Sequence, residues 1–107
     1  MGVPEITVDE LAERMAAGAP VIDVREPDEY VDGHVPSARH IPLTDVPARL
    51  DEIPVTDAVL VICRSGARSL RAAEFLAAHG IPAVNVSGGT LAWIDSGRVV
   101  VTGDTPG

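Results

Sequence analysis

The only cysteine of the chain, Cys63, opens a six-residue stretch, CRSGAR, that joins an apolar run to an alanine-rich run. Such a loop can turn successive backbone N–H groups inward, and a helix that follows it adds partial positive charge at the same place. Because Arg64 and Arg68 add further positive charge, we expect the pKa of the Cys63 thiol to be lowered and the thiolate to form at neutral pH. A thiolate in a cradle of N–H groups is a nucleophile for anionic compounds that contain sulfur or phosphorus.

A structural interpretation of Cys63 is also possible, because free cysteines often fill hydrophobic cores. Polar residues, Arg64-Ser65-Gly66, follow this cysteine directly, and this favours a functional role. A cation in the first turn of a helix opposes the helix dipole. We therefore expect Arg68 to close the loop from inside by bonding to backbone carbonyls.

The segments around this loop alternate between strand and helix. Apolar runs predict strands at 21–24, 58–62 and 83–86, with a short extended piece around Ile41 and an edge strand at 98–101. Capping residues and apolar periodicity predict helices at about 7–17, 27–33, 46–52, 69–79 and 90–97, the first capped by Thr7 and the last by Thr90. This order predicts an α/β fold: a doubly wound, mainly parallel sheet with helices on both faces.

Three loops leave the carboxyl ends of the predicted strands, where ligands bind in sheets of this kind. They are Arg25–Pro27, Cys63–Arg68 and Ser87–Gly89. Gly88-Gly89 could let the backbone approach the cysteine loop closely, or could simply form a tight turn into the next helix. The sequence therefore predicts a site made by these loops at one edge of the sheet.

The composition limits the partners of the protein. With 16 Asp and Glu against 8 Lys and Arg, the net charge of −8 disfavours nucleic acid. We expect no membrane partner and a cytoplasmic location, because no apolar run approaches about 18 residues and the acidic N-terminal segment does not resemble a signal peptide. Three scattered histidines and one cysteine have no metal-ligand spacing, so we expect no metal and no cofactor. We expect one domain, residues 1–101, followed by a flexible tail, residues 102–107.

Three segments together resemble one known family. They are VIDVREPDEYVDGHVPSARHIPL at 21–43, VLVICRSGARSLRAAEFLAAHG at 59–80 and VNVSGGTLAW at 84–93. In this order they resemble the single-domain rhodaneses, which are thiosulfate-type sulfurtransferases. One departure is Ser37, where the family pattern usually has glycine, and we expect it to change only a turn.

The resemblance implies a reaction and a set of site residues. Cys63 would attack the outer sulfur of thiosulfate or a related small anionic donor, become a persulfide, and pass the sulfur to cyanide, a thiol or an acceptor protein. The loop would bind the anion through Arg64, Ser65, Gly66, Ala67 and Arg68. Because the sequence has no second cysteine, the acceptor must come from outside the chain.

Three further residues of the family pattern are interpreted as supports. We expect Asp23 to hydrogen-bond nearby backbone and Arg25 to pair with Glu29 or another carboxylate, although Arg25 could also lie at the substrate mouth. We expect His34 to make a structural hydrogen bond and not to act as a general base.

Two alternatives remain open at this point. The related phosphatases and arsenate reductases use a loop one residue longer, Cys-x5-Arg, whereas this chain has Ser69 at the longer spacing and Arg68 at the shorter one. The protein could also be a persulfide relay or partner-binding module in a sulfur pathway, since a relay needs the same persulfide.

Overall fold

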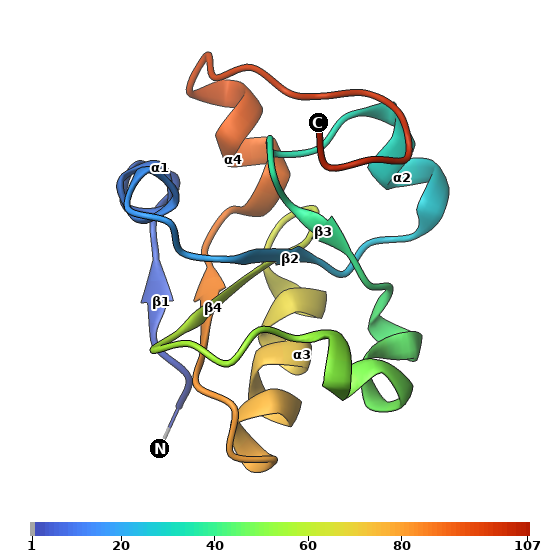
Figure 1. Ribbon diagram of the computed structural model, residues 1–107. Helices are drawn as coiled ribbons and strands as arrows, with labels where there is room; N and C mark the ends of the chain where they lie inside the picture. Colours follow the sequence, from blue (N-terminus) through green and yellow to red (C-terminus); the bar gives the residue numbers. More distant parts are fainter. Residues whose placement is uncertain (1) are drawn as a thin grey trace.

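A five-stranded sheet forms the centre of the computed structural model, which describes residues 2–107 (Figure 1). All neighbouring strands are parallel, in the order β1-β5-β4-β2-β3. The strands are β1 (Glu5–Ile6), β2 (Val21–Asp23), β3 (Arg39–His40), β4 (Val59–Ile62) and β5 (Ala83–Val86). Because the strands are parallel, their carboxyl ends all point to one edge of the sheet.

Helices cover both faces of this sheet. They are α1 (Val8–Ala16), α2 (Pro27–Asp32), the 3₁₀ helix η1 (Leu43–Glu52), α3 (Ala67–Ala78) and α4 (Gly89–Asp95). One buried cluster joins the sheet to α3 and η1, and a second joins it to α1 and α4. The predicted doubly wound α/β fold is therefore confirmed, with the sheet parallel throughout.

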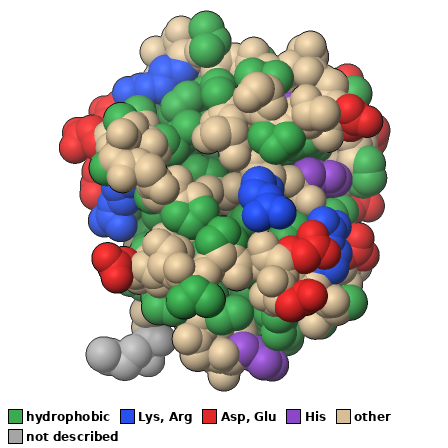
Figure 2. Space-filling view, in the orientation of Figure 1, with side chains coloured by type: hydrophobic (Ala, Val, Ile, Leu, Met, Phe, Trp, Pro, Cys, Tyr) green, Lys and Arg blue, Asp and Glu red, His purple; other side chains and the backbone are tan. Residues whose placement is uncertain are grey.

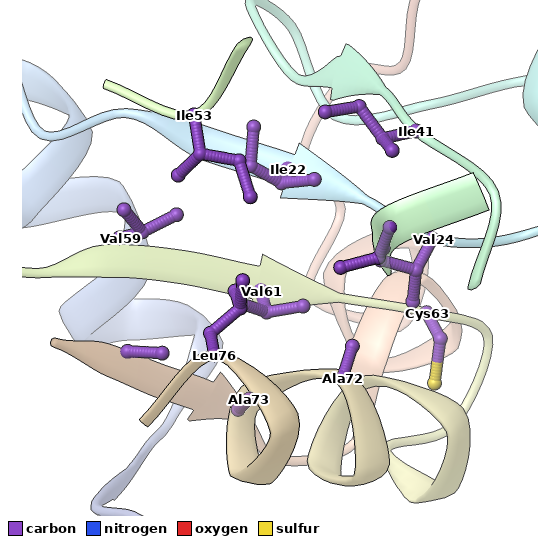
Figure 3. Packing of buried hydrophobic residues seen from close by; sticks show 12 residues of the cluster. Ile22, Val24, Ile41, Ile53, Val59, Val61, Cys63, Ala72, Ala73 and Leu76 are labelled. Atoms are coloured by element: carbon purple, nitrogen blue, oxygen red, sulfur yellow. The ribbon is translucent and has the colours of Figure 1, made fainter. Parts of the chain in front are cut away.

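The central strand β4 shows why the cysteine lies where it does. Val59 and Val61 pack on the side of α3, while Leu60 and Ile62 pack on the opposite side, and all four are fully buried. This alternation is what a parallel strand covered on both faces requires. Cys63 is the next residue on the α3 side, and Figure 3 shows it just beyond the end of the strand, near Ala72 of α3.

Several predicted boundaries are wrong in detail. The helix predicted at 46–52 begins at Leu43 and is a 3₁₀ helix, broken by non-helical backbone at Arg49. Pro47, which lies inside it, has no N–H to donate to the preceding turn. Helix α3 begins two residues before the predicted start, after Gly66 in the left-handed region (φ +119°). The two-residue strand β1 is not among the predicted strands.

The edge strand predicted at 98–101 is also wrong. Only Val101 forms a bridge, antiparallel to His34. The segment is held by other contacts: Trp93 Nε1 donates to the carbonyl of Val99 at 2.8 Å, and Arg98 pairs with Asp9 at 3.0 Å. These contacts hold residues 98–99 beside α4 and α1, and the segment pairs with the rest of the chain only through the single bridge at Val101.

The C-terminal segment passes from α4 over α2 (Figure 1). The N–H of Gly103 donates to Val31 O at 2.9 Å, and the N–H of Ser37 donates to Pro106 O at 3.0 Å. Ser37 has φ +70°, a conformation that glycine adopts without strain. The division of the chain after residue 101 and the flexibility of 102–107 stay predictions. No helix within residues 2–107 is long and apolar enough to cross a membrane.

Candidate active site

The Cys63 side chain lies in a loop that folds back on it. Cys63 is 1% exposed, and its Sγ accepts hydrogen bonds from the Gly66 N–H at 3.1 Å and the Ser69 hydroxyl at 3.2 Å. Gly66 turns the chain in the left-handed region and directs its N–H toward the sulfur at the start of α3. The cradle expected from the sequence therefore forms around the sulfur atom.

The surroundings of Cys63 act in opposite directions on its acidity. Burial raises the pKa of the thiol, but the Ser69 hydroxyl and the N–H groups of Ser69, Gly66 and Ser65 stabilise the thiolate and bring the pKa below its ordinary value. The expected direction of the pKa shift is thus found, and it comes from hydrogen-bond donors of the loop, as the expected cradle of N–H groups implies, with the Ser69 hydroxyl as an additional donor.

Arg68 does not close the loop onto backbone carbonyls as expected. Its Nη1 and Nη2 donate to Glu29 Oε1 and Oε2 at 2.7 and 2.9 Å. These hydrogen bonds, opposed by burial and supported by the N–H of Glu26, hold the pKa of Glu29 at about 2. The pair ties α2 to the first turn of α3. Glu29 thereby neutralises the positive charge of Arg68, which we had expected to help bind the anion.

Asp23 and Arg25 form a buried pair at the carboxyl end of β2. Arg25 Nη2 lies 2.8 Å from Asp23 Oδ2 and also donates to Gly33 O at 2.9 Å, while the Arg25 N–H donates to Asp23 Oδ1. The carboxylate that pairs with Arg25 is therefore Asp23 and not Glu29. Through Gly33 the pair also holds the end of α2.

His34 is fully buried beside this pair. Its Nδ1 lies 2.8 Å from Tyr30 O, so this nitrogen carries the proton that it donates. The ring stacks on that of Tyr30 with 3.7 Å between centroids, and the N–H and carbonyl of His34 both bond to Val101. These contacts join α2 to the C-terminal segment.

The N-terminus of α4 clamps the outer side of the cysteine loop. The Thr90 N–H and hydroxyl both donate to Cys63 O, at 2.9 and 3.0 Å, and the Leu91 N–H donates to Arg64 O at 3.1 Å. A Cβ on Gly89 would lie 2.5 Å from Cys63 O and 2.6 Å from Arg64 O. Of the two possibilities that the sequence left open for Gly88-Gly89, the structure thus shows a close approach of the backbone at Gly89 to the cysteine loop. Thr90 lies in the first turn, after Gly88 at the cap, and is not the cap residue we expected.

Three polar residues of the site, Ser69, Asn85 and Glu5, are absent from the residues predicted for it. Asn85 is 1% exposed, and its Oδ1 accepts from the Ser69 hydroxyl at 2.5 Å. Its Nδ2 donates to Glu5 Oε2 at 2.7 Å and to Gly66 O at 3.2 Å. An asparagine inside the apolar run AVNV was a sequence signal for such a contact. No comparable signal in the sequence pointed to Glu5, because Glu5 reaches the site through strand β1, which was not predicted.

A cavity of about 240 Å³ lies beside the loop. Arg25 and Arg64 contribute basic side chains to its lining, Glu29 and Asp32 acidic ones, and Leu91 and other apolar residues the remainder. A slightly larger cavity, about 260 Å³, lies at the amino ends of β2 and β4, away from the cysteine. Within residues 2–107, no group of three or more His, Cys, Asp or Glu side chains is arranged to hold a metal ion.

Comparison with known proteins gives a consistent result. The model of the rhodanese-like domain family matches residues 7–96. A sulfurtransferase of Allochromatium vinosum is 38% identical over 102 residues, which cover 92% of this chain and 95% of the relative. The solved structure of a rhodanese-related protein from Thermoplasma volcanium is 34% identical with a TM-score of 0.87, covering 94% of this chain and 99% of the other.

A thiosulfate sulfurtransferase from Pseudomonas aeruginosa is also similar in structure. It is 27% identical with a TM-score of 0.85, covering 96% of this chain and 21% of that one. The chain therefore belongs to the rhodanese-like family: it is a rhodanese-like sulfurtransferase with a single, buried cysteine.

Proposed function

We propose that the protein moves a sulfane sulfur from thiosulfate, or a related small anionic donor, to a thiophilic acceptor such as cyanide or a thiol, through a persulfide on Cys63. The observation that carries this proposal is the hydrogen-bonded cradle around Cys63 Sγ at the end of the central strand. A thiolate that forms in this cradle is a nucleophile, and covalent catalysis divides one difficult transfer into two easier ones.

The first step forms a bond between Cys63 Sγ and the outer sulfur of thiosulfate. The sulfur–sulfur bond of thiosulfate breaks, and sulfite leaves with the bonding electron pair. The product is an anionic persulfide on Cys63. The Gly66 N–H, 3.1 Å from Sγ, and its neighbours on the loop are suited to bind this extra anionic sulfur.

The second step transfers the outer sulfur. Cyanide attacks it, a carbon–sulfur bond forms, and the electrons of the breaking sulfur–sulfur bond return to Cys63 as thiolate, releasing thiocyanate. A thiolate acceptor would leave with the sulfur as a small persulfide in the same way. The sequence has no second cysteine, so the acceptor comes from outside this chain in either case.

Arg64 is proposed to attract the anionic donor. It is exposed and lines the cavity beside the loop, and its side chain has no ion-pair partner within residues 2–107. By contrast, Arg68 and Arg25 are neutralised by Glu29 and Asp23. Arg64 is therefore the unpaired cation that a dianion such as thiosulfate would meet at the loop.

Steady-state formation of thiocyanate from thiosulfate and cyanide tests this role. We expect Arg64→Ala to raise the KM for thiosulfate about tenfold, the effect of one charge-assisted contact, with a smaller change in kcat. Arg71→Ala removes another exposed arginine, on α3 outside the loop, and serves as the control with an unchanged KM. Equal KM values in the wild type and Arg64→Ala would contradict the donor-binding role of Arg64. Hydrolysis of an aryl phosphate that disappears in Cys63→Ser would replace the proposed reaction with phosphatase chemistry.

A further inference from the structure

The Ser69 hydroxyl has one proton and three acceptors within reach. Its Oγ lies 2.5 Å from Asn85 Oδ1, 3.2 Å from Cys63 Sγ and 3.3 Å from Gly66 O. A serine hydroxyl has only one O–H to donate. Asn85 and Cys63 therefore compete for the same proton, and the short oxygen–oxygen distance favours Asn85.

The direction of the Asn85 amide is set by two groups that can only accept hydrogen bonds. Its Nδ2 lies 2.7 Å from the Glu5 carboxylate and 3.2 Å from the carbonyl of Gly66. Turning the amide over would bring Oδ1 against both acceptors. The oxygen of Asn85 must therefore face Ser69, where it can accept a hydrogen bond but cannot donate one.

The sheet brings Glu5 and Asn85 together. Glu5 on β1 and Asn85 on β5 are direct partners in the parallel register. Ser69 and Asn85 are buried, at 0% and 1% exposure, whereas Glu5 is exposed. A row of contacts thus leads from a surface carboxylate through Asn85 to Ser69, whose single proton goes either to Asn85 Oδ1 or to Cys63 Sγ.

The other charged groups near the loop are arranged differently. The Arg68 cation interacts with the Cys63 thiolate, but Glu29 of α2 pairs with it, and the exposed Arg64 has no such partner within residues 2–107. At the end of β2, Arg25 is paired with Asp23. Of these groups, only Glu5 is hydrogen-bonded to Asn85, the residue that competes with Cys63 for the Ser69 proton.

We propose that Asn85, oriented by Glu5, is a positioning residue that draws the Ser69 proton away from Cys63 and so keeps the thiolate more basic and more nucleophilic. A thiolate that receives fewer hydrogen bonds is a stronger base, and the intrinsic nucleophilicity of thiolates rises with their basicity. The hydrogen bond from the Gly66 N–H to Cys63 Sγ is present whichever acceptor takes the Ser69 proton. The inference rests on the proposed function only in taking Cys63 as the reacting atom.

A double-mutant cycle on thiol ionisation tests this proposal. The measurement is the rate of alkylation by iodoacetamide against pH, followed by intact mass, in the wild type, Asn85→Ala, Ser69→Ala and the double variant. The midpoint of the profile reports the ionisation of Cys63 and does not depend on how easily the reagent reaches the sulfur. We expect Asn85→Ala to lower the midpoint by about half to one pH unit, because Ser69 then donates fully to the thiolate. In the Ser69→Ala background, the same substitution should leave the midpoint unchanged.

Glu5→Ala provides a second variant that removes no buried side chain. Glu5→Ala removes one of the two acceptors of the Asn85 Nδ2 group and leaves the Gly66 carbonyl as the other. Because Asn85 itself remains, we expect a smaller downward shift of the alkylation midpoint than in Asn85→Ala. Loss of the carboxylate charge also lowers the midpoint, but that part persists in the Ser69→Ala background. The shift of the midpoint in the wild-type background, minus the shift in the Ser69→Ala background, is therefore the part that acts through Ser69. If this difference were zero for both Glu5→Ala and Asn85→Ala, the proposal would be overturned.

Other outcomes are equally decisive. A midpoint that rises or stays constant in Asn85→Ala would show that Asn85 supports the hydrogen bond from Ser69 to sulfur, or has no part in it. If the expected shifts appear but thiosulfate yields no persulfide, the positioning role stands and the proposed function fails. The alkylation midpoint does not depend on sulfur transfer, so the two failures are distinguishable.

Discussion

Arg68 and Glu29, 39 residues apart in the sequence, meet in a two-point ion pair beside the cysteine. The two hydrogen bonds measure 2.7 and 2.9 Å, and both side chains are partly shielded from solvent. A guanidinium and a carboxylate matched in this way hold each other in one orientation. At the scale of single residues, the pair fixes the loop against α2 and leaves Arg64 as the loop cation that is free to meet a ligand.

This ion pair gives the folded protein a specific dependence on pH. The pKa of Glu29 lies at about 2 in the folded protein, against an ordinary value of 4.5. Its stabilisation is therefore complete above about pH 4.5 and is lost as the pH falls toward 2. We expect Glu29→Gln to lower the thermal unfolding midpoint at pH 7 and to flatten its decline between pH 4.5 and 2.

A matched control for this prediction is Glu52→Gln. It breaks the ion pair between Glu52 and Arg49, whose side chains are 40% and 34% exposed. Exposed pairs contribute little to stability, so we expect a smaller change at pH 7. If the midpoint of Glu29→Gln declined with acid as steeply as that of the wild type, the ion pair would not be the source of the dependence.

At the scale of elements, the contact between α4 and the cysteine loop shapes the site. The first N–H groups of α4 bind the carbonyls of Cys63 and Arg64. With these carbonyls held outward, N–H groups of the same loop are free to face the sulfur. The contact requires a residue without a side chain at Gly89, where a Cβ would overlap the loop backbone.

Gly89→Ala should therefore damage both the fold and the site. Gly89 has φ +59°, and its Cβ would meet backbone atoms at 2.5–2.7 Å. We expect the free energy of unfolding to fall by about 3–5 kcal/mol, from backbone strain and overpacking together, with loss of sulfur transfer. Denaturant unfolding and the thiocyanate assay measure the two effects.

The control for Gly89→Ala is Gly97→Ala at the other end of α4. Gly97 has φ +82°, but nothing lies within 4 Å of the position that a Cβ would take there. This variant carries the backbone strain alone, about 1–2 kcal/mol, and should retain sulfur transfer. Equal losses of stability in the two variants would mean that the approach of α4 to the loop is not tight.

At the scale of the whole molecule, the parallel sheet brings distant segments to one edge. The ends of β2, β4 and β5 lead to Arg25, Cys63 and Gly89, which lie within one site. The surface around the fold carries the excess of acidic side chains. Figure 2 shows acidic side chains mostly toward the two sides of one face, with hydrophobic and neutral groups and one basic side chain across its middle. Arg64 therefore places an exposed positive charge at the cysteine loop of a protein whose net charge is −8.

Much of this arrangement could be predicted from local sequence patterns. The run VLVI predicts a strand buried on both faces, and the residues after Cys63 predict a loop that enters a helix. Contacts between distant elements could not be predicted in this way. The Arg68–Glu29 pair depends on where α2 lies, and the Glu5–Asn85 contact depends on a two-residue strand whose partner lies 80 residues away. Thr90, expected as a helix cap, instead donates to Cys63 because Gly88 and Gly89 begin the helix earlier.

The most direct measurement is the intact mass of the protein before and after incubation with thiosulfate, and again after the addition of cyanide, for the wild type and Cys63→Ser. We predict that only the wild type gains the mass of one sulfur atom, and that cyanide removes it with release of thiocyanate. No gain in the wild type, or an equal gain in Cys63→Ser, would contradict a persulfide on Cys63 as the carrier of the transferred sulfur.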